Sequence, residues 1–146
     1  MQKISVVNEN VMFMREACWC CDNSNCEIKT GCIAVKHGKV ILKAWNSIEK
    51  MNLPKKPERE NAVHAEKNLF DKALERNLSL WECTLYTTRF PCLDCAQLLS
   101  DAGIIKIFYM SDLFTKGNTA QSFFEQNNIE TFQIKEGEVW DGTYQT

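Results

Sequence analysis

The sequence predicts an α/β domain in which a β-hairpin is followed by alternating strands and helices. One observation is a pair of short β-like runs, 31–36 and 39–45, separated by two residues. A second is the strand and helix alternation after residue 83, which is typical of parallel β-α-β units. The 146 residues, 45% of them hydrophobic, are enough for one domain with a sizeable core. Without an internal repeat, we predict a single domain over residues 1–146.

Composition narrows the class of protein. The net charge of −2 and the isoelectric point of about 5.7 argue against sequence-blind nucleic-acid binding, which requires a basic surface. No apolar run approaches the ~20 residues that span a membrane. The charged residues Lys3, Glu9 and Arg15 do not fit a signal peptide. We therefore expect a cytoplasmic protein without a membrane segment.

The first third of the chain should form a helix and then the hairpin. The segment from about Asn8 to Asp22 lacks helix breakers and ends at the turn-rich run 22–25. Its apolar side is predicted to hold Val11, Met14, Ala17 and either Cys18 or Cys21. Because two residues ending in glycine favour a tight turn, we assign His37 and Gly38 to the hairpin connection and not to a metal site.

A polar, proline-containing loop is predicted from Asn46 to Asn61, and a second helix from about Val63 to Arg76. Glu66 falls on the apolar stripe of this helix. A carboxylate in such a place is unfavourable unless it is paired or functional. Glu66 is therefore conspicuous on pattern alone. The other members of the stripe are Leu69, Phe70, Ala73 and Leu74.

The second half should alternate strand and helix. A strand over Cys83–Thr88 is followed by a helix that has Pro91 in its first turn and ends at 101–103. The nearly unbroken apolar run Ile104–Met110 is typical of a strand covered on both faces. A helix near 119–127 and a strand near 130–134 complete the pattern, and the tail after Gly137 receives no assignment.

Chemistry is indicated by His64-Ala65-Glu66 together with the later C-x-x-C pair of Cys92 and Cys95. One imidazole and two thiolates are one ligand short of a structural zinc site, and an open fourth position can hold a reactive water. His64 and the cysteine pair each lie at a predicted helix start, where unpaired N–H groups lower a thiol pKa. We predict one catalytic Zn²⁺ held by these three side chains.

Glu66 is the predicted proton carrier of this site. Zinc lowers the pKa of its water toward ~7, and Glu66 can accept the proton while hydroxide attacks C4 of cytosine or C6 of adenine. The same carboxyl returns protons to the ring and to the departing amine, so ammonia leaves. The alternatives are a structural zinc and a redox dithiol. A redox pair needs no distant His-x-Glu, and a structural site should offer a fourth strong ligand.

At these residues the chain resembles the cytidine and deoxycytidylate deaminase superfamily. The segments 102–104 and 108–112, which follow the Cys92–Cys95 motif, are most similar to the deoxycytidylate (dCMP) deaminase branch. The segments that carry the resemblance are Thr30–Val35, Val40–Leu42, Ala44–Ser47, Val63–Asn68 and Leu85–Ala96.

The resemblance implies a three-layer α/β/α fold with a mixed five-stranded sheet. It implies one zinc per subunit, a homo-oligomer (dimer or hexamer) and a free cytosine nucleotide as substrate, with dCMP converted to dUMP. Zinc is assigned to His64, Cys92 and Cys95, and proton transfer to Glu66. The residues expected to contact substrate are Asn46, Ala65, Phe90 and Arg89. From its residue type alone, Asn46 is equally a loop residue.

Some features leave the substrate open. Ala44 and Ser47 stand where the family has glycines around Asn46, and the loop that follows lacks a glycine-rich stretch. The alternative substrates are another nucleobase or nucleoside, and an adenosine or cytosine in tRNA or single-stranded nucleic acid. A catalytically silent zinc module is a third class of protein. The basic residues that could meet a phosphate are Lys50, Lys55, Lys56, Arg59 and Arg89.

Six further cysteines need a separate interpretation. Cys18, Cys20, Cys21 and Cys26 have the spacing C-x-C-C-x₄-C, which contains no chelating C-x-x-C, although Cys18 and Cys21 lie one helical turn apart. Since buried free cysteine behaves as a small apolar residue, we expect no second, structural zinc. Cys32 and Cys83 fall in predicted strands and are assigned to the core.

Overall fold

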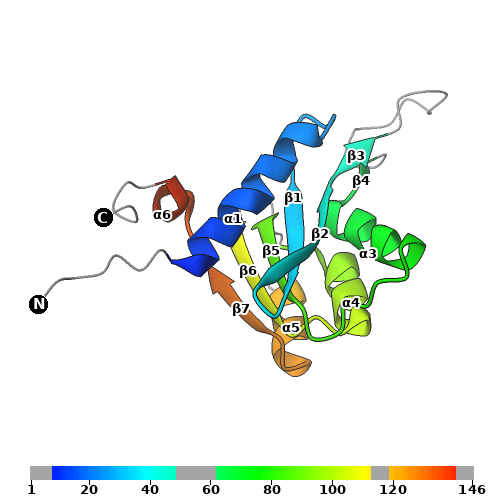
Figure 1. Ribbon diagram of the computed structural model, residues 1–146. Helices are drawn as coiled ribbons and strands as arrows, with labels where there is room; N and C mark the ends of the chain where they lie inside the picture. Colours follow the sequence, from blue (N-terminus) through cyan, green and yellow to red (C-terminus); the bar gives the residue numbers. More distant parts are fainter. Residues whose placement is uncertain (1–7, 49–61, 113–118, 141–146) are drawn as a thin grey trace, which may run out of the picture.

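The computed structural model describes residues 8–48, 62–112 and 119–140, and its elements form three layers (Figure 1). The strands are β1 (Gly31–Lys36), β2 (Lys39–Trp45), β3 (Ser47–Ile48), β4 (Ala62–Val63), β5 (Thr84–Arg89), β6 (Lys106–Ser111) and β7 (Glu130–Gln133). The helices are α1 (Glu9–Cys20), α3 (Ala65–Glu75), α4 (Leu93–Ala102), α5 (Thr119–Gln126) and α6 (Glu136–Trp140), with a 3₁₀ turn at Cys21–Asn23.

A five-stranded sheet with the order β2-β1-β5-β6-β7 forms the middle layer. β1 pairs antiparallel with both β2 and β5, whereas β5, β6 and β7 are parallel. The predicted hairpin and the predicted β-α-β units therefore meet at β1 and β5, and the prediction of a mixed five-stranded sheet is confirmed. His37 and Gly38 make the hairpin turn with φ values of 51° and 74°, which suits a tight turn.

Both faces of the sheet are covered by helices. Successive residues of β1 point to opposite faces, so Cys32 and Ala34 pack with α3, α4 and α5, while Ile33 and Val35 pack with α1. α6 lies on the α1 side, where Val139 is buried. β6 departs from the prediction of a fully buried strand, because Ile107 is buried but its other residues are only half-buried. Its partner β7 is an edge strand of the sheet.

Two predicted helix starts are wrong by one or two residues. Val63 belongs to β4, where it pairs with Ser47, and so α3 begins at Ala65 with His64 as its N-cap. Pro91 precedes the next helix instead of lying in its first turn. The reason is that Cys92 is the N-cap of α4, with extended backbone and a sulfur that accepts from the Cys95 amide. Two of the three predicted metal ligands, His64 and Cys92, thus cap helices.

Other departures follow from contacts distant in sequence. The predicted loop from Asn46 contains β3, which pairs with β4; residues 49–61 lie outside the described part. Leu74, predicted on the buried face of α3, is 68% exposed. The described part of the unassigned tail completes α6, which is fixed to α1 by a 2.8 Å hydrogen bond from Arg15 Nε to the Val139 carbonyl. No helix in the described ranges is long and apolar enough to cross a membrane.

Gly31 gives a stability prediction, because β1 begins directly beneath the end of α1. A Cβ on Gly31 would collide with the Ala17 carbonyl oxygen and lie 2.8 Å from the Cys20 Cβ. We expect Gly31→Ala to lower the free energy of unfolding by about 1–3 kcal/mol, measured by urea titration. Gly137→Ala is the matched control, since a Cβ there meets nothing within 4 Å. Equal stability of the two variants would contradict this close approach.

Candidate active site

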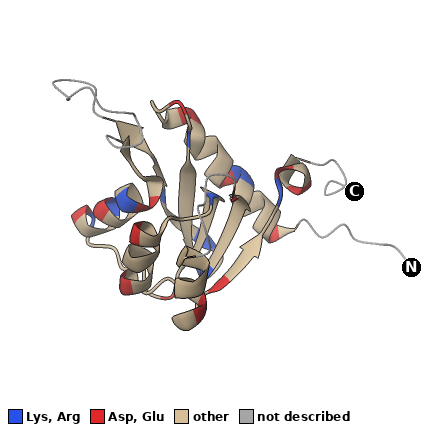
Figure 2. Ribbon diagram, turned by 180° about the vertical axis from the view of Figure 1, so that it is seen from behind, with Lys and Arg blue, Asp and Glu red and all other residues tan. Residues whose placement is uncertain are grey.

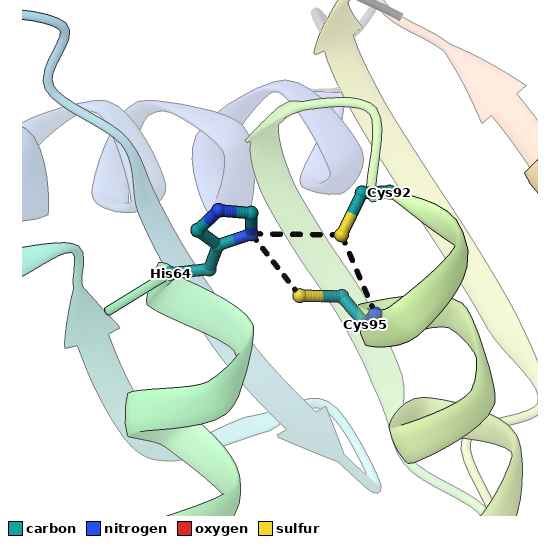
Figure 3. Close-up of side chains that lie close together, drawn as sticks. All are labelled: His64, Cys92 and Cys95. Carbon is teal, nitrogen blue, oxygen red and sulfur yellow. Dashed lines mark hydrogen bonds between the residues drawn. The ribbon is translucent and has the colours of Figure 1, made fainter. Parts of the chain in front are cut away.

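The candidate site lies where the first turns of α3 and α4 meet (Figure 3). His64 caps α3, Cys92 caps α4, and Cys95 follows in the first turn of α4. The N-cap backbone is extended in both cases, with ψ of 153° at His64 and 170° at Cys92, and this turns the side chains out of the helices toward each other. Two helix starts therefore present three potential ligands to one point.

The distances between these ligands fit a zinc ion. His64 Nδ1 lies 3.6 Å from Cys92 Sγ and 3.4 Å from Cys95 Sγ, and the three ligand atoms are all within 4.8 Å of one another. A tetrahedron with Zn–S of about 2.3 Å and Zn–N of about 2.0 Å has an N···S edge of about 3.5 Å. Cys95 is buried while His64 and Cys92 are exposed, so solvent reaches one side. In the described ranges, no other cluster of potential ligands has this proximity.

The two thiols differ in acidity. Hydrogen bonding to Cys95 and to His64 lowers the pKa of Cys92 to about 4, against the opposing effect of burial. Hydrogen bonding to Cys92 and burial raise the pKa of Cys95, and the separate hydrogen bond between His64 and Cys92 raises the pKa of His64. Cys92 is thus the first of the pair to ionise. Binding a metal would require both thiols to be thiolates and His64 to be neutral.

Glu66 lies in the first turn of α3 and is only 4% exposed. Burial raises its pKa to about 7, and the charges of His64 and Arg89 act in the opposite direction. A carboxyl group that titrates near neutrality can both accept and return a proton at neutral pH. The arrangement therefore places a potential general acid and base on the same helix as the candidate ligand His64.

Three of the residues predicted to contact substrate adjoin this centre. Ala65 is fully buried at the start of α3, and Arg89 is half-buried at the end of β5. Phe90 follows Arg89, but its ring packs edge-on against the rings of Tyr109 and Phe124, with distances between ring centres of 4.8 Å and 5.7 Å. The Phe90 ring is therefore also a core group. Contacts of these residues with a substrate stay predictions.

Asn46, the fourth predicted contact, is buried and binds the loop over residues 24–30. Its Oδ1 accepts from Ser24 Oγ at 2.6 Å and from the Thr30 amide at 2.9 Å. Its Nδ2 donates to the Ile28 carbonyl at 2.8 Å, and its amide donates to the Thr30 carbonyl at 3.0 Å. The side chain thus holds a loop in place, whatever it also does toward a substrate.

Sequence reasoning gave Asn68 no role. Asn68 Nδ2 donates to the Trp45 carbonyl at 2.7 Å and to Ser47 Oγ at 3.1 Å, on the two sides of Asn46. The sequence did give an indication of this role, because asparagine is disfavoured in a helix interior unless its side-chain amide makes hydrogen bonds.

The remaining cysteines have contacts of their own. Cys18 Sγ lies 3.7 Å from Met110 Sδ, and burial raises the Cys18 pKa to about 12. Cys21 Sγ lies 3.7 Å from Thr88 Oγ1 and also faces the carbonyls of Ala17 and Lys29. Cys32 and Cys83 are fully buried, which confirms their assignment to the core. The basic residues predicted near a phosphate, apart from Arg89, lie outside the described part: Lys50, Lys55, Lys56 and Arg59.

Several known proteins are similar to this chain over the region that contains the candidate centre. The crystal structure of a dCMP deaminase from the cyanophage S-TIM5 is similar with a TM-score of 0.74 and 25% identity, over 86% of this chain and 96% of that one. A tRNA-specific adenosine deaminase from Aquifex aeolicus is 35% identical over 57% of this chain. A probable deoxycytidylate deaminase from Drosophila melanogaster is 42% identical over 36% of it. The chain spans 52% and 25% of these two relatives.

The sequence profile of one family covers most of the chain and includes all three candidate ligands. It matches residues 7–111, which extend from the start of α1 to the end of β6. The match contains both helix starts that meet at the candidate centre. The chain belongs to the family described as the cytidine and deoxycytidylate deaminase zinc-binding region.

Proposed function

We propose that this protein is a zinc-dependent hydrolytic deaminase of a free cytosine nucleotide, and that it converts dCMP to dUMP and ammonia. The observation that carries the proposal is the placement of a buried, readily protonated Glu66 on the helix whose N-cap is the ligand His64. A purely structural zinc site gains nothing from a buried carboxyl group, whose desolvation is unfavourable.

The proposed roles follow from the positions. His64, Cys92 and Cys95 would hold one Zn²⁺ and leave its fourth position open. When bound, zinc supplies a nucleophile at neutral pH by lowering the pKa of water toward ~7. Glu66 would take one proton from the attacking water and deliver it to ring nitrogen N3, and it would then carry the remaining proton of the new C4 hydroxyl to the amino group. A C4–O bond forms, the C4–N bond breaks, and ammonia leaves.

The choice of dCMP rests on two supports. In the structural comparison the cyanophage dCMP deaminase superposes with a TM-score of 0.74, whereas a tRNA:A34 deaminase, matched at the same 25% identity and also covered almost completely, superposes with a TM-score of 0.53. Arg89 provides a half-buried positive charge next to the candidate centre, where its effect reaches both His64 and Glu66. We assign Arg89 to the substrate phosphate, and we assign Asn46, Ala65 and Phe90 to the sugar and base.

A second candidate is deamination of adenosine in tRNA. The 35% identity to the Aquifex relative favours it. Polynucleotide binding would require a basic, aromatic channel. Figure 2 shows acidic and basic segments interspersed over the described elements, in agreement with the net charge of −2. The free nucleotide is therefore the first choice.

Replacement of Glu66 tests the mechanism. We expect Glu66→Gln to keep the fold and the zinc but to lower kcat for dCMP at least about 10³-fold, because the general acid and base is lost. Ammonia release, zinc content and thermal unfolding would be measured on the same sample. Glu75→Gln, at the exposed end of α3, is the control and should retain full activity. Substantial turnover by Glu66→Gln would disprove the proton-carrier role.

Replacement of a ligand tests the metal centre. We expect one zinc per chain in a homo-oligomer, read by native mass spectrometry, and loss of that zinc in Cys95→Ser. Cys18→Ser is the matched control and should keep the metal, since Cys18 contacts Met110 and not this centre. Zinc affinity should fall as the pH is lowered, because protons compete for the thiolates and the imidazole. Retention of zinc by Cys95→Ser would contradict the ligand assignment.

A substrate panel separates the two candidates. Ammonia release would be followed with free cytosine, cytidine, dCMP, adenosine and a tRNA anticodon stem-loop. We expect dCMP to be preferred and a chelator to abolish the reaction, since without zinc the nucleophile is lost. A reaction confined to the stem-loop would replace the first candidate by the second.

A further inference from the structure

Asn68 connects the helix of the candidate centre to the chain segment over residues 45–48. It lies one helical turn after His64, and its Nδ2 donates both to the Trp45 carbonyl and to Ser47 Oγ. Lys72, a further turn along α3, places its ammonium 4.1 Å from the centre of the Trp45 ring and donates to the Lys43 carbonyl at 2.8 Å. One face of α3 thus holds this segment at several points.

The same segment is joined to the residue before the metal ligand. Ser47 pairs with Val63 in the short β3–β4 ladder, and Val63 is followed directly by His64. Ser47 is therefore connected to α3 in two ways. It accepts a hydrogen bond from Asn68 on the helix, and it pairs with Val63 just before the helix. A displacement of Ser47 would therefore also displace His64.

From this segment the hydrogen bonds continue into the 24–30 loop. Asn46 binds Ser24, Ile28 and Thr30 as described above. The Asn25 side chain forms a two-point contact with Ile48, donating to its carbonyl at 2.7 Å and accepting from its amide at 2.9 Å. The far end of the loop is held by Thr88, whose Oγ1 accepts from the Gly31 amide at 3.1 Å.

These contacts form one continuous path between the two chain regions that carry the candidate ligands. It begins on α3 at Asn68, crosses to Asn46, passes through the 24–30 loop and ends at Thr88, which lies shortly before Cys92 in the chain. The path combines hydrogen bonds of Asn68, Asn46 and Thr88 with short covalent stretches of chain at 45–47 and through the 24–30 loop, so moving one end displaces the next.

We propose that Asn68 is a positioning residue for the substrate. Its amide sets the position of the 45–48 segment, and through Asn46 that of the 24–30 loop, relative to the helix that carries His64 and Glu66. This inference rests on the proposed function, because it assigns the 45–48 segment to one wall of the nucleotide-binding site. The Asn68 side chain contacts neither the candidate ligands nor the reacting atoms in this role, and its backbone amide donates to the His64 carbonyl at 3.0 Å within the first turn of the helix.

The test compares Asn68→Ala with Lys67→Ala. Alanine is the best helix former, so loss of helix propensity cannot explain an effect of Asn68→Ala. Lys67→Ala removes an exposed ion pair with Asp71 from the same helix without touching the segment. Asn68→Asp is a second variant, which keeps the size of the side chain but lacks the donor. The readouts are hydrogen exchange of the Asn46 and Ile48 amides, zinc content, and KM and kcat for dCMP.

For Asn68→Ala we expect KM for dCMP to rise about tenfold, which corresponds to ~1.4 kcal/mol, with kcat changed less than about threefold. The Asn46 and Ile48 amides should exchange at least about tenfold faster, while the amides of β1 and the zinc content stay as in the parent. Asn68→Asp should behave in the same way, and Lys67→Ala should resemble the parent in every readout.

A merely structural role gives a different result. Unchanged KM together with a lower melting temperature would overturn the proposal, as would unchanged exchange of the Asn46 and Ile48 amides. If the parent protein does not turn over dCMP, the proposed function fails on its own. The exchange rates then still decide whether Asn68 holds the segment, since they are measured without substrate.

Discussion

The structure depends on one constraint, which is that the first turns of two helices far apart in sequence must meet. α3 reaches the point after a crossover from the hairpin edge of the sheet, and α4 leaves it after β5. Their N-cap residues supply His64 and Cys92, and the unpaired N–H groups of a helix start favour a thiolate. The packing of α3 against α4, which share one core, therefore also sets the chemistry of the centre.

The burial of Glu66 shows how stability and function oppose each other at this centre. A carboxyl whose folded pKa lies near 7 is held partly protonated by its surroundings, so its ionised form is disfavoured in the folded state. The protein loses stability at neutral pH by keeping it there. The same burial raises the pKa of Glu66 to a value at which it can accept and release a proton near neutral pH, and Ala65 and Leu69, on the same helix, are fully buried as well.

Local pattern was sufficient to predict the strand–helix alternation, which depends on residues close in sequence, and two short motifs, His64–Glu66 and Cys92–Cys95, were sufficient to predict that the three candidate ligands meet. His64, Glu66 and Cys95 were singled out from spacing, helical phase and the family resemblance. Features that require distant partners were missed. Val63 was placed in a helix although it pairs with Ser47, and α6 received no assignment because its burial depends on α1. The pattern also gave no sign that Leu74 would face solvent, because the sheet is already covered by its neighbours on α3.

The hydrogen bonds of Asn46 limit what this residue can offer a substrate. Both lone pairs of Oδ1 are used, by Ser24 Oγ and by the Thr30 amide, and one N–H of Nδ2 donates to the Ile28 carbonyl. What is left for a ligand is the other N–H of Nδ2. A nucleotide that meets Asn46 must then present an acceptor, such as a sugar hydroxyl oxygen or a base carbonyl. The other bonds of Asn46 hold the 24–30 loop in place, and Asn68 fixes the neighbouring 45–48 segment to the helix that carries Glu66.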